Sequence, residues 1–282
     1  MAEKPPVVLT VAGFDPSSGA GVTADIKTIA AHNCYGVACI TAMTVQSTAG
    51  VRRVEAVNPQ IVAQTLQELL SDVGFAAVHI GMLASANVLE VVADFLSEEK
   101  IENVVLDPIL KSSSGADLLD QTGAKLLVEK LIPLSTVITP NVHEAAVITG
   151  QPVTNTDEMK AAAAQMHAMG AKSVVITGGH LEKATDLLSF TTRRGIEQEI
   201  FKSQRQKSNS THGTGCAFAT AMACHLALGR GLPEAVLLAK AYVAAAIANA
   251  HPLGKGIGPV HHLYRMKQAQ RRTIPAESEG VN

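Results

Sequence analysis

The sequence has no tryptophan and few other aromatic residues, with 3 Tyr and 6 Phe among its 282 residues. Proteins that bind single-stranded nucleic acid stack the bases on aromatic side chains, and this chain is poorly supplied with them. An excess of charge is also lacking, because 23 Lys and Arg stand against 25 Asp and Glu. Without a basic surplus there is no general attraction to nucleic acid or to an anionic membrane. We therefore expect neither among the partners.

Cysteine and long apolar runs are scarce as well. No Cys-x-x-Cys pair and no zinc-like spacing occurs among the four cysteines, which are Cys34, Cys39, Cys216 and Cys224. No stretch approaches the roughly 18 apolar residues of a membrane span, and segment 241–250, which comes closest, is too short. Only a few residues precede the first apolar run, so no signal-peptide core is predicted. We expect a cytoplasmic protein with reduced thiols.

The composition that is present belongs to a folded globular protein. Of all residues 47% are hydrophobic and 17% are charged, and the mean hydropathy is +0.19. A chain of 282 residues has room for one large domain or two small ones. No linker rich in proline, serine or charge divides it, and no internal repeat is visible. We expect one domain over residues 1–267, followed by a polar, flexible tail at residues 268–282.

Short apolar runs alternate with amphipathic segments along the chain. Strands are predicted at Val7–Ala12, Ala38–Val45, Ala77–Ile80, Val104–Leu106, Val137–Thr139 and Val174–Thr177. Helices are predicted at Thr23–Asn33, Pro59–Val73, Asn87–Glu99, Leu118–Leu131, Asp157–Met169, Cys216–Leu228 and Pro233–Ala250. A hairpin is predicted from Leu187–Thr191 and Ile196–Phe201. This alternation predicts an α/β fold with a mostly parallel central sheet and helices on both faces.

Polar or glycine-rich residues follow most of the predicted strands. They are Gly13-Phe14-Asp15, Gln46, Gly81-Met82, Asp107, Asn141 with Glu144, and Gly178-Gly179-His180. Ligands of open α/β sheets bind outside the carboxyl ends of the strands. The sequence therefore predicts one site built from many loops.

The strongest local motif is Thr211-His212-Gly213-Thr214-Gly215-Cys216, which leads directly into a predicted helix. Its glycines permit a tight turn, after which unpaired N–H groups at the helix N-terminus can bind an anion. The alternative is an ordinary glycine-rich helix entry. A thiol at such a terminus is expected to have a lowered pKa, and Cys216 occupies that position.

Other features have ordinary explanations that compete with functional ones. Gly19-Ala20-Gly21-Val22-Thr23-Ala24 matches a dinucleotide-binding pattern, but its glycines lie several residues beyond the strand and the second strand ends without an acidic residue. No Walker A pattern follows Gly21. Taken alone, Asp25 is typical of a solvated helix surface, and Glu144 of a partner for a helix dipole. The scattered histidines lack metal-ligand spacing and are interpreted as structural or surface residues.

Taken together, a set of ordered motifs resembles the hydroxymethylpyrimidine/phosphomethylpyrimidine kinases of thiamine biosynthesis, within the ribokinase-like superfamily. The resemblance extends over about Val7 to Gly258. It is carried by Ala12-Gly13-Phe14-Asp15-Pro16-Ser17-Ser18-Gly19-Ala20-Gly21, Ala24-Asp25-Ile26-Lys27-Thr28, Thr41-Ala42-Met43-Thr44-Val45-Gln46-Ser47-Thr48, Gly81-Met82-Leu83, Leu106-Asp107-Pro108, Thr139-Pro140-Asn141-Val142-His143-Glu144-Ala145, Gly178-Gly179-His180-Leu181 and His212-Gly213-Thr214-Gly215-Cys216.

The resemblance implies ATP-dependent phosphorylation of 4-amino-5-hydroxymethyl-2-methylpyrimidine and then of its monophosphate. The implied substrate contacts are Gly13, Asp25, Thr44, Gln46, Met82 and Ile109. Within this set, Asp25 and Gln46 would hydrogen-bond the aminopyrimidine edge, and Met82 would pack on the ring. The alternatives are a pyridoxal kinase, since that ring also bears a hydroxymethyl group, and a catalytically idle ligand-binding member.

For the phosphoryl-transfer end, the resemblance implies ATP or phosphate contacts at Asn141, Thr177, Gly179 and Lys240. Asp107 and Glu144 would lie near Mg²⁺, a cation that prefers oxygen ligands. Gly213, Thr214 and Gly215 would form the anion site. There Cys216 would act as the base or only fill space, with the proton passing late to phosphate. A homodimer is implied as well. Thr177 departs from the family, where Lys is frequent, and Phe14 stands where Ser is commoner.

Overall fold

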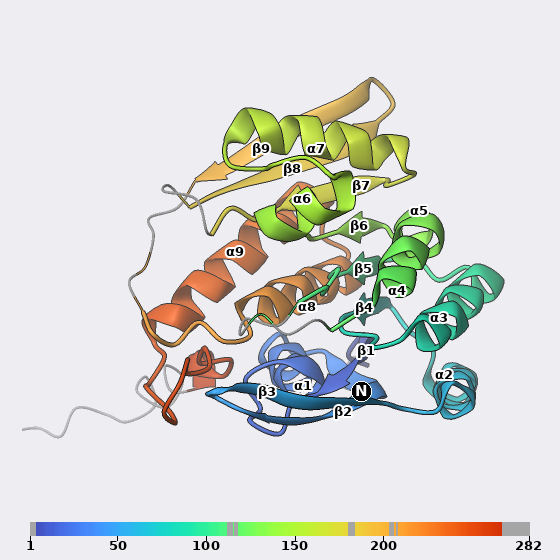
Figure 1. The fold of residues 1–282 in the computed structure, drawn as a ribbon, viewed down its shortest axis with the longest axis vertical. Helices are drawn as coiled ribbons and strands as arrows, with labels where there is room; N and C mark the ends of the chain where they lie inside the picture. Colours follow the sequence, from blue (N-terminus) through green and yellow to red (C-terminus); the bar gives the residue numbers. More distant parts are fainter. Residues whose placement is uncertain are drawn as a thin grey trace, which may run out of the picture.

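A nine-stranded sheet organises the computed structural model, which describes residues 4–111, 115, 118–179, 184–202, 206 and 208–266. The strand order is β3-β2-β1-β4-β5-β6-β7-β8-β9 (Figure 1). The strands are β1 (Val7–Phe14), β2 (Tyr35–Ser47), β3 (Gly50–Ala56), β4 (Ala77–Ile80), β5 (Val104–Leu106), β6 (Val137–Ile138), β7 (Ser173–Ile176), β8 (Thr185–Thr192) and β9 (Gly195–Lys202). From β2 through β7 every neighbouring pair is parallel, and β3, β8 and β9 add antiparallel edges. The predicted α/β class is confirmed.

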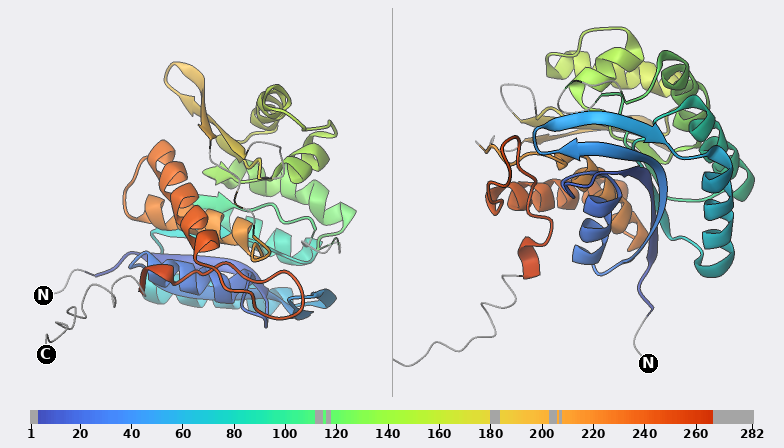
Figure 2. Two further views of the ribbon diagram at one scale, coloured as in Figure 1. Left: turned by 90° about the vertical axis from the view of Figure 1, so that its left-hand side faces the viewer. Right: turned by 60° about the horizontal axis from the view of Figure 1, so that its bottom comes forward.

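Helices cover both faces of the sheet (Figures 1 and 2). The helical elements are α1 (Gly21–Ala31), α2 (Pro59–Val73), α3 (Ala86–Glu99), α4 (Gln121–Leu126), a π-helical turn (Leu127–Leu131), α5 (Ile132–Leu134), α6 (Val142–Thr149), α7 (Thr156–Ala168), α8 (Thr214–Ala227) and α9 (Leu232–Ala248). Successive side chains of a strand point to opposite faces, so Leu9 and Val11 join one core with α2, α3 and α7. Val8 joins the other core, with α1, α8 and α9. Because both faces of the sheet are covered, its central strands are apolar at nearly every position.

Several helix starts coincide with side-chain caps. The side chains of Asn58, Ser85, Asn141 and Asn155 accept hydrogen bonds from first-turn N–H groups of α2, α3, α6 and α7. At α6 the cap is reciprocal, because Glu144 Oε2 in turn accepts from the Asn141 backbone N–H at 2.9 Å. The strand–helix junctions at the site are therefore fixed by local sequence.

Three regions differ from the prediction, and one of them is α6, which was not among the predicted helices. The β3 strand was not predicted, because it lies at the sheet edge and much of it is exposed, which leaves little apolar periodicity. The helix predicted at Leu118–Leu131 begins instead at Gln121, where the Asp120 side chain accepts from the Gly123 N–H. It continues through the π-helical turn into α5. The predicted tail, 268–282, lies outside the described residues.

Within the described part of the chain, no helix is long and apolar enough to cross a membrane.

Candidate functional site

The loops at the carboxyl ends of the parallel strands converge, as the sequence predicted. A Cβ added to Gly13, at the end of β1, would lie 2.2 Å from Met82 Cε beyond β4, so the end of the methionine side chain packs directly against this glycine. Met82 is 8% exposed and packs with Ala42 and Leu118, and Ile109 packs against the same group. These contacts bring together Gly13, Met82 and Ile109, three of the predicted substrate contacts.

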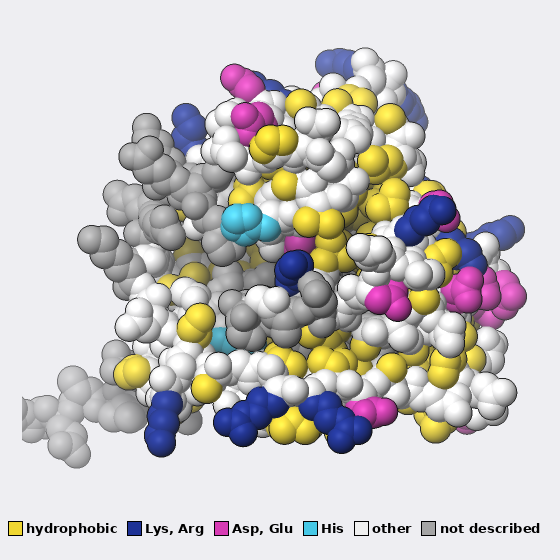
Figure 3. All heavy atoms as spheres, in the orientation of Figure 1, with side chains coloured by type: hydrophobic (Ala, Val, Ile, Leu, Met, Phe, Trp, Pro, Cys, Tyr) yellow, Lys and Arg dark blue, Asp and Glu magenta, His cyan; other side chains and the backbone are white. Residues whose placement is uncertain are grey.

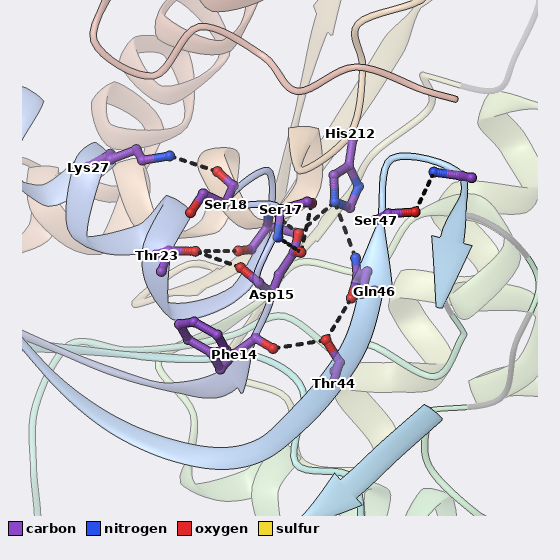
Figure 4. A network of polar contacts seen from close by, with 12 residues as sticks. Phe14, Asp15, Ser17, Ser18, Thr23, Lys27, Thr44, Gln46, Ser47 and His212 are labelled. Atoms are coloured by element: carbon purple, nitrogen blue, oxygen red, sulfur yellow. Dashed lines mark hydrogen bonds and ion pairs between the residues drawn. The ribbon is translucent and has the colours of Figure 1, made fainter. Parts of the chain in front are cut away.

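The end of β2 adds polar groups to this side of the site (Figure 4). The Thr44 hydroxyl lies 2.9 Å from the Phe14 carbonyl and 3.2 Å from Gln46 Oε1, and Gln46 Nε2 lies 3.3 Å from His212 Nε2. His212 Nε2 also lies 2.8 Å from Asp15 Oδ2. Burial opposes ionisation of Asp15, but hydrogen bonds from His212 and Ser17 outweigh it and lower the pKa of this carboxyl.

Asp25 does not lie where the resemblance places it. Its side chain is completely buried in α1, and its oxygens accept hydrogen bonds from Thr10 at 2.7 Å and from Thr220 at 2.8 Å. His79 Nδ1 lies 3.3 Å from the same carboxylate. A group with no exposed surface and satisfied oxygens cannot hydrogen-bond a ring at the site, so the prediction of direct contact is wrong. Asp25 belongs to a polar network beneath the site.

Two carboxyl groups face the centre of the site from β5 and α6. Asp107 follows β5, and a Cβ on Gly215 would lie 3.6 Å from Asp107 Oδ2, so this carboxyl lies beside the start of α8. Burial raises the pKa of Asp107 to about 7, against a lowering by His79 and with a further rise from Asp25. Burial and the charge of Asp107 raise the pKa of Glu144 well above its usual range. The two carboxyl groups therefore interact.

Close backbone packing fixes the conformation of the chain just before α8. Gly213 precedes the helix with φ of 79°, and a Cβ there would lie 1.8 Å from the Gly19 carbonyl oxygen. No side chain caps the helix; the Thr214 N–H donates to the Thr211 carbonyl at 3.3 Å, and the other first-turn N–H groups and the positive end of the dipole are available to an anion. The predicted turn and helix entry are confirmed.

Cys216 lies in the first turn of α8, but its predicted thiolate is wrong. Burial raises the pKa of this thiol well above its usual range, and the nearby charges of Asp107, Asp25 and Glu144 raise it further. A hydrogen bond from the Gly21 backbone N–H to the sulfur lowers the pKa without reversing the shift. The helix dipole is therefore outweighed, and the thiol is neutral in the free protein.

The proposed phosphate contacts lie around the ends of β6 and β7. Thr177 and Asn141 form a parallel bridge between these ends. Lys240, on α9, forms an ion pair with Asp186, and Asp186 Oδ1 accepts from the Gly178 N–H at 2.9 Å. Lys240 therefore reaches this loop with its charge already paired. Gly179 is exposed, and 180–183, which include the rest of the predicted motif, lie outside the described residues.

Sequence reasoning missed the part played by Asp15, His79 and His212. Asp15 and His212 both belong to quoted motifs, and their flanking glycines signalled close loop packing. Nothing in the sequence paired them, because they are 197 positions apart. His79 lies in a buried strand, where a polar residue needs a partner, and that was the available signal.

Comparisons with known proteins show similarity over most of the chain. A family model described as phosphomethylpyrimidine kinase matches residues 15–261. The hydroxymethylpyrimidine/phosphomethylpyrimidine kinase of Salmonella typhimurium is 42% identical over 259 residues, which are 91% of this chain and 97% of that protein. The thiamine biosynthesis bifunctional protein of Geobacter sulfurreducens is 41% identical over 267 residues, or 94% of this chain; the chain spans about half of that relative's length, 54%. An ADP complex of Bacillus subtilis pyridoxal kinase aligns with a TM-score of 0.84 at 34% identity, covering 93% of this chain and 100% of that one.

Proposed function

Because the chain belongs to the phosphomethylpyrimidine kinase family, we propose that it phosphorylates 4-amino-5-hydroxymethyl-2-methylpyrimidine with ATP, and then phosphorylates the monophosphate, in thiamine biosynthesis. The observation that carries the proposal is a series of contacts that joins the two ends of the site. Met82 touches Gly13, the Gly13 carbonyl lies against Gly21, and the Gly21 N–H donates to Cys216 at the start of α8. An apolar face for a ring therefore adjoins an anion site.

At the ring end, Met82 and Ile109 would pack on the pyrimidine, and the Gln46 amide would both donate to and accept from its amino-substituted edge. Thr44 supports that amide from the same strand. The hydroxymethyl group would then point toward α8. Phosphoryl transfer depends mainly on such positioning and on charge stabilisation, and little covalent chemistry is required of the protein.

At the phosphoryl end, the N–H groups of Gly213, just before α8, and of Thr214 and Gly215, its first residues, would stabilise the negative charge that develops during transfer. Asn141, Thr177, Gly179 and Lys240 would line the ATP phosphates. The desolvated Asp107 and Glu144 carboxyl groups fit Mg²⁺, because it takes one or two carboxylates and keeps several waters. The described residues hold no cluster of three or more ligating side chains. When bound, Mg²⁺ would neutralise phosphate charge.

We assign Cys216 the role of base for the substrate hydroxyl, with its thiol neutral until the ligands are in place. Asp107 and Glu144 are two of the three carboxyl groups that raise its pKa. Neutralising their charge would leave the helix N-terminus and the Gly21 N–H, which both lower the pKa of the thiol, with fewer negative charges against them. Neutralisation would remove part of what raises the pKa of Cys216, while burial, the largest cause, would remain.

The second candidate is a pyridoxal kinase, which the likeness to the Bacillus subtilis pyridoxal kinase structure favours. The Gln46 amide favours the aminopyrimidine, whose edge offers a donor beside an acceptor. The decisive experiment is a coupled ADP-release assay with both alcohols, with mass spectrometry of the products. Faster turnover of pyridoxal would reverse the ranking, and no turnover of either alcohol would indicate an idle binding module.

A substitution at Gln46 tests the ring end separately. Gln46→Ala should weaken pyrimidine binding by about 1–3 kcal/mol, because it leaves polar groups of the bound ring without partners. ATP affinity should stay the same, since Gln46 lies at the ring end. Isothermal titration with each ligand measures both values. Equal losses for the two ligands would show that Gln46 has a structural role only.

We further propose a cytoplasmic location and a homodimer. The first is supported by the co-substrate, because ATP is a cytoplasmic metabolite. The second is supported by exposed apolar side chains on β2, where Met43 is 48% and Val45 56% exposed.

A further inference from the structure

The amide of Gln46 is the end of a hydrogen-bonded series that starts at Asp15 (Figure 4). His212, from the loop before α8, lies between the two and contacts both through the same ring nitrogen, Nε2. The family assignment gives Asp15 and His212 no role. Their contacts show which way the amide must face.

Asp15 determines which atoms of the series donate a hydrogen bond and which accept one. Its Oδ1 accepts from the Ser17 N–H at 2.8 Å and from the Ser17 hydroxyl at 2.7 Å, and its Oδ2 accepts from the Ala20 N–H at 3.0 Å. A side chain with three donors already directed at it is an acceptor, and the lowered pKa of Asp15 agrees with this. His212 Nε2, 2.8 Å from Oδ2, therefore carries a proton and donates it.

A ring nitrogen that carries a proton cannot accept another. The Nε2 proton points mainly at Asp15, 2.8 Å away, and is shared with the Gln46 amide at 3.3 Å. The group of Gln46 that faces His212 must then be the amide oxygen, because the amide nitrogen would place two N–H groups against each other. The other end agrees. The Thr44 hydroxyl has one proton and lies 2.9 Å from the Phe14 carbonyl, so it donates there and accepts from the Gln46 amide nitrogen. In the structure Gln46 Nε2 faces His212 and Oε1 faces Thr44. A half-turn of the amide, which exchanges two groups of nearly equal size, gives the orientation that these donors and acceptors require.

We propose that Asp15 and His212 are positioning residues that hold the Gln46 amide with its oxygen toward His212 and its nitrogen toward Thr44. This rests on the proposed function. The remaining lone pair of the oxygen and the remaining N–H then reach the substrate in one fixed order along β2. A ring whose edge has its donor and acceptor in the matching order is selected. A ring that lacks this donor–acceptor pair, such as pyridoxal, gains no binding energy from the fixed orientation of the amide.

The first test is direct and needs no turnover. Nitrogen-15 NMR of the full-length protein, with His212 assigned by comparison with His212→Gln, reports which ring nitrogen carries the proton. The expected result is a protonated Nε2 that loses this state in Asp15→Ala. A His212 Nε2 without a proton would overturn the proposal, because the amide nitrogen would then face it.

The second test is kinetic and uses His212→Leu, with His212→Gln as the conservative variant. His212→Leu should raise KM for the pyrimidine about 3- to 10-fold, the cost of one neutral hydrogen bond. KM for ATP and for pyridoxal should stay within 2-fold of the parent values, and kcat should change little. His212→Gln keeps an N–H donor and should recover part of the loss. Ser47→Ala is the matched control on β2, since its hydroxyl contacts the Ala49 N–H.

The possible failures are distinguishable. Turnover of neither alcohol by the parent would remove the proposed function, and the NMR measurement would still decide the state of His212. Normal pyrimidine turnover with an unchanged pyrimidine KM in His212→Leu would overturn the positioning role. Equal rises in KM for pyrimidine and ATP would also overturn it, because they would show general damage to the loop before α8. If His212→Leu does not fold, the state of Nε2 in the parent decides.

Discussion

At the scale of single residues, the environment of a side chain outweighs its position in a motif. Cys216 has the helix N-terminus that ordinarily favours a thiolate, yet burial and three neighbouring carboxyl groups keep it neutral. Asp25 has the motif position of a substrate contact, yet Thr10 and Thr220 take both of its oxygens. The sequence specified the location of both residues. It could not specify their solvation, which depends on residues from other elements.

The role of Cys216 gives a prediction about rate. Cys216→Ala should lower the single-turnover rate on the order of 10²–10⁴-fold, the usual contribution of a general base. Cys216→Ser should also be slow, because a serine hydroxyl is a far weaker base. Rapid-quench phosphorylation with saturating ATP, pyrimidine and Mg²⁺ measures both. A rate within a few-fold of the parent would assign catalysis to the N–H groups of α8, with the proton passing late to phosphate.

Asp107 gives a prediction about pH. Its pKa is raised from 3.8 to about 7. Between these two pH values the folded protein keeps a proton on Asp107 that the unfolded chain has lost. Stability should therefore fall as the pH rises through this window, and the raised pKa of His79 acts with the same sign. Asp107→Asn is neutral throughout and should flatten the decline. Urea unfolding at several pH values in Mg²⁺-free buffer is the measurement, and an equal decline in both proteins would contradict the assignment.

At the scale of elements, burial decides what a sequence pattern reveals. β1, β4, β5 and β7 are predictable because both of their faces are covered, which requires apolar side chains at every position. β3 is not, because its exposed edge carries Arg52, Arg53 and Glu55. Helix starts are predictable where one side chain caps them. The pairing of Asp15 with His212 depends on two loops meeting, and no local pattern records it.

The α6 cap connects an element to the chemistry of the site. Asn141→Ala should cost about 1 kcal/mol of stability, because two first-turn N–H groups lose their acceptor. It should also lower kcat, because Asn141 is itself a proposed phosphate contact and its side chain accepts from the Glu144 N–H. Asn155→Ala is the matched control, because Asn155 caps α7 in the same way. Urea unfolding and steady-state kinetics should show similar stability losses and a kinetic defect in Asn141→Ala only; matching kinetics would remove Asn141 from the proposed phosphate contacts.

At the scale of the whole molecule, the two edges of the sheet differ in how they meet solvent. The β9 edge is exposed and carries Glu197, Glu199 and Lys202, charges that oppose pairing with another chain. Near the other edge, Met43 and Val45 of β2 are exposed. Figure 3 shows hydrophobic side chains between Lys and Arg side chains along the lower edge of the molecule, where β2 and β3 lie. The second edge is the better surface for an interface.

The homodimer is therefore expected to form through β2 and β3. Sedimentation equilibrium of the parent should give twice the chain mass of 29.4 kDa. Met43→Lys should shift the equilibrium toward monomer, because it places a charge in the apolar part of the interface. Ile196→Lys, at an exposed position of β9, should leave the mass unchanged. A parent mass near 29.4 kDa across a wide concentration range would exclude the dimer. Equal dissociation by both variants would place the interface elsewhere, since a charge on β9 lies at the opposite end of the sheet.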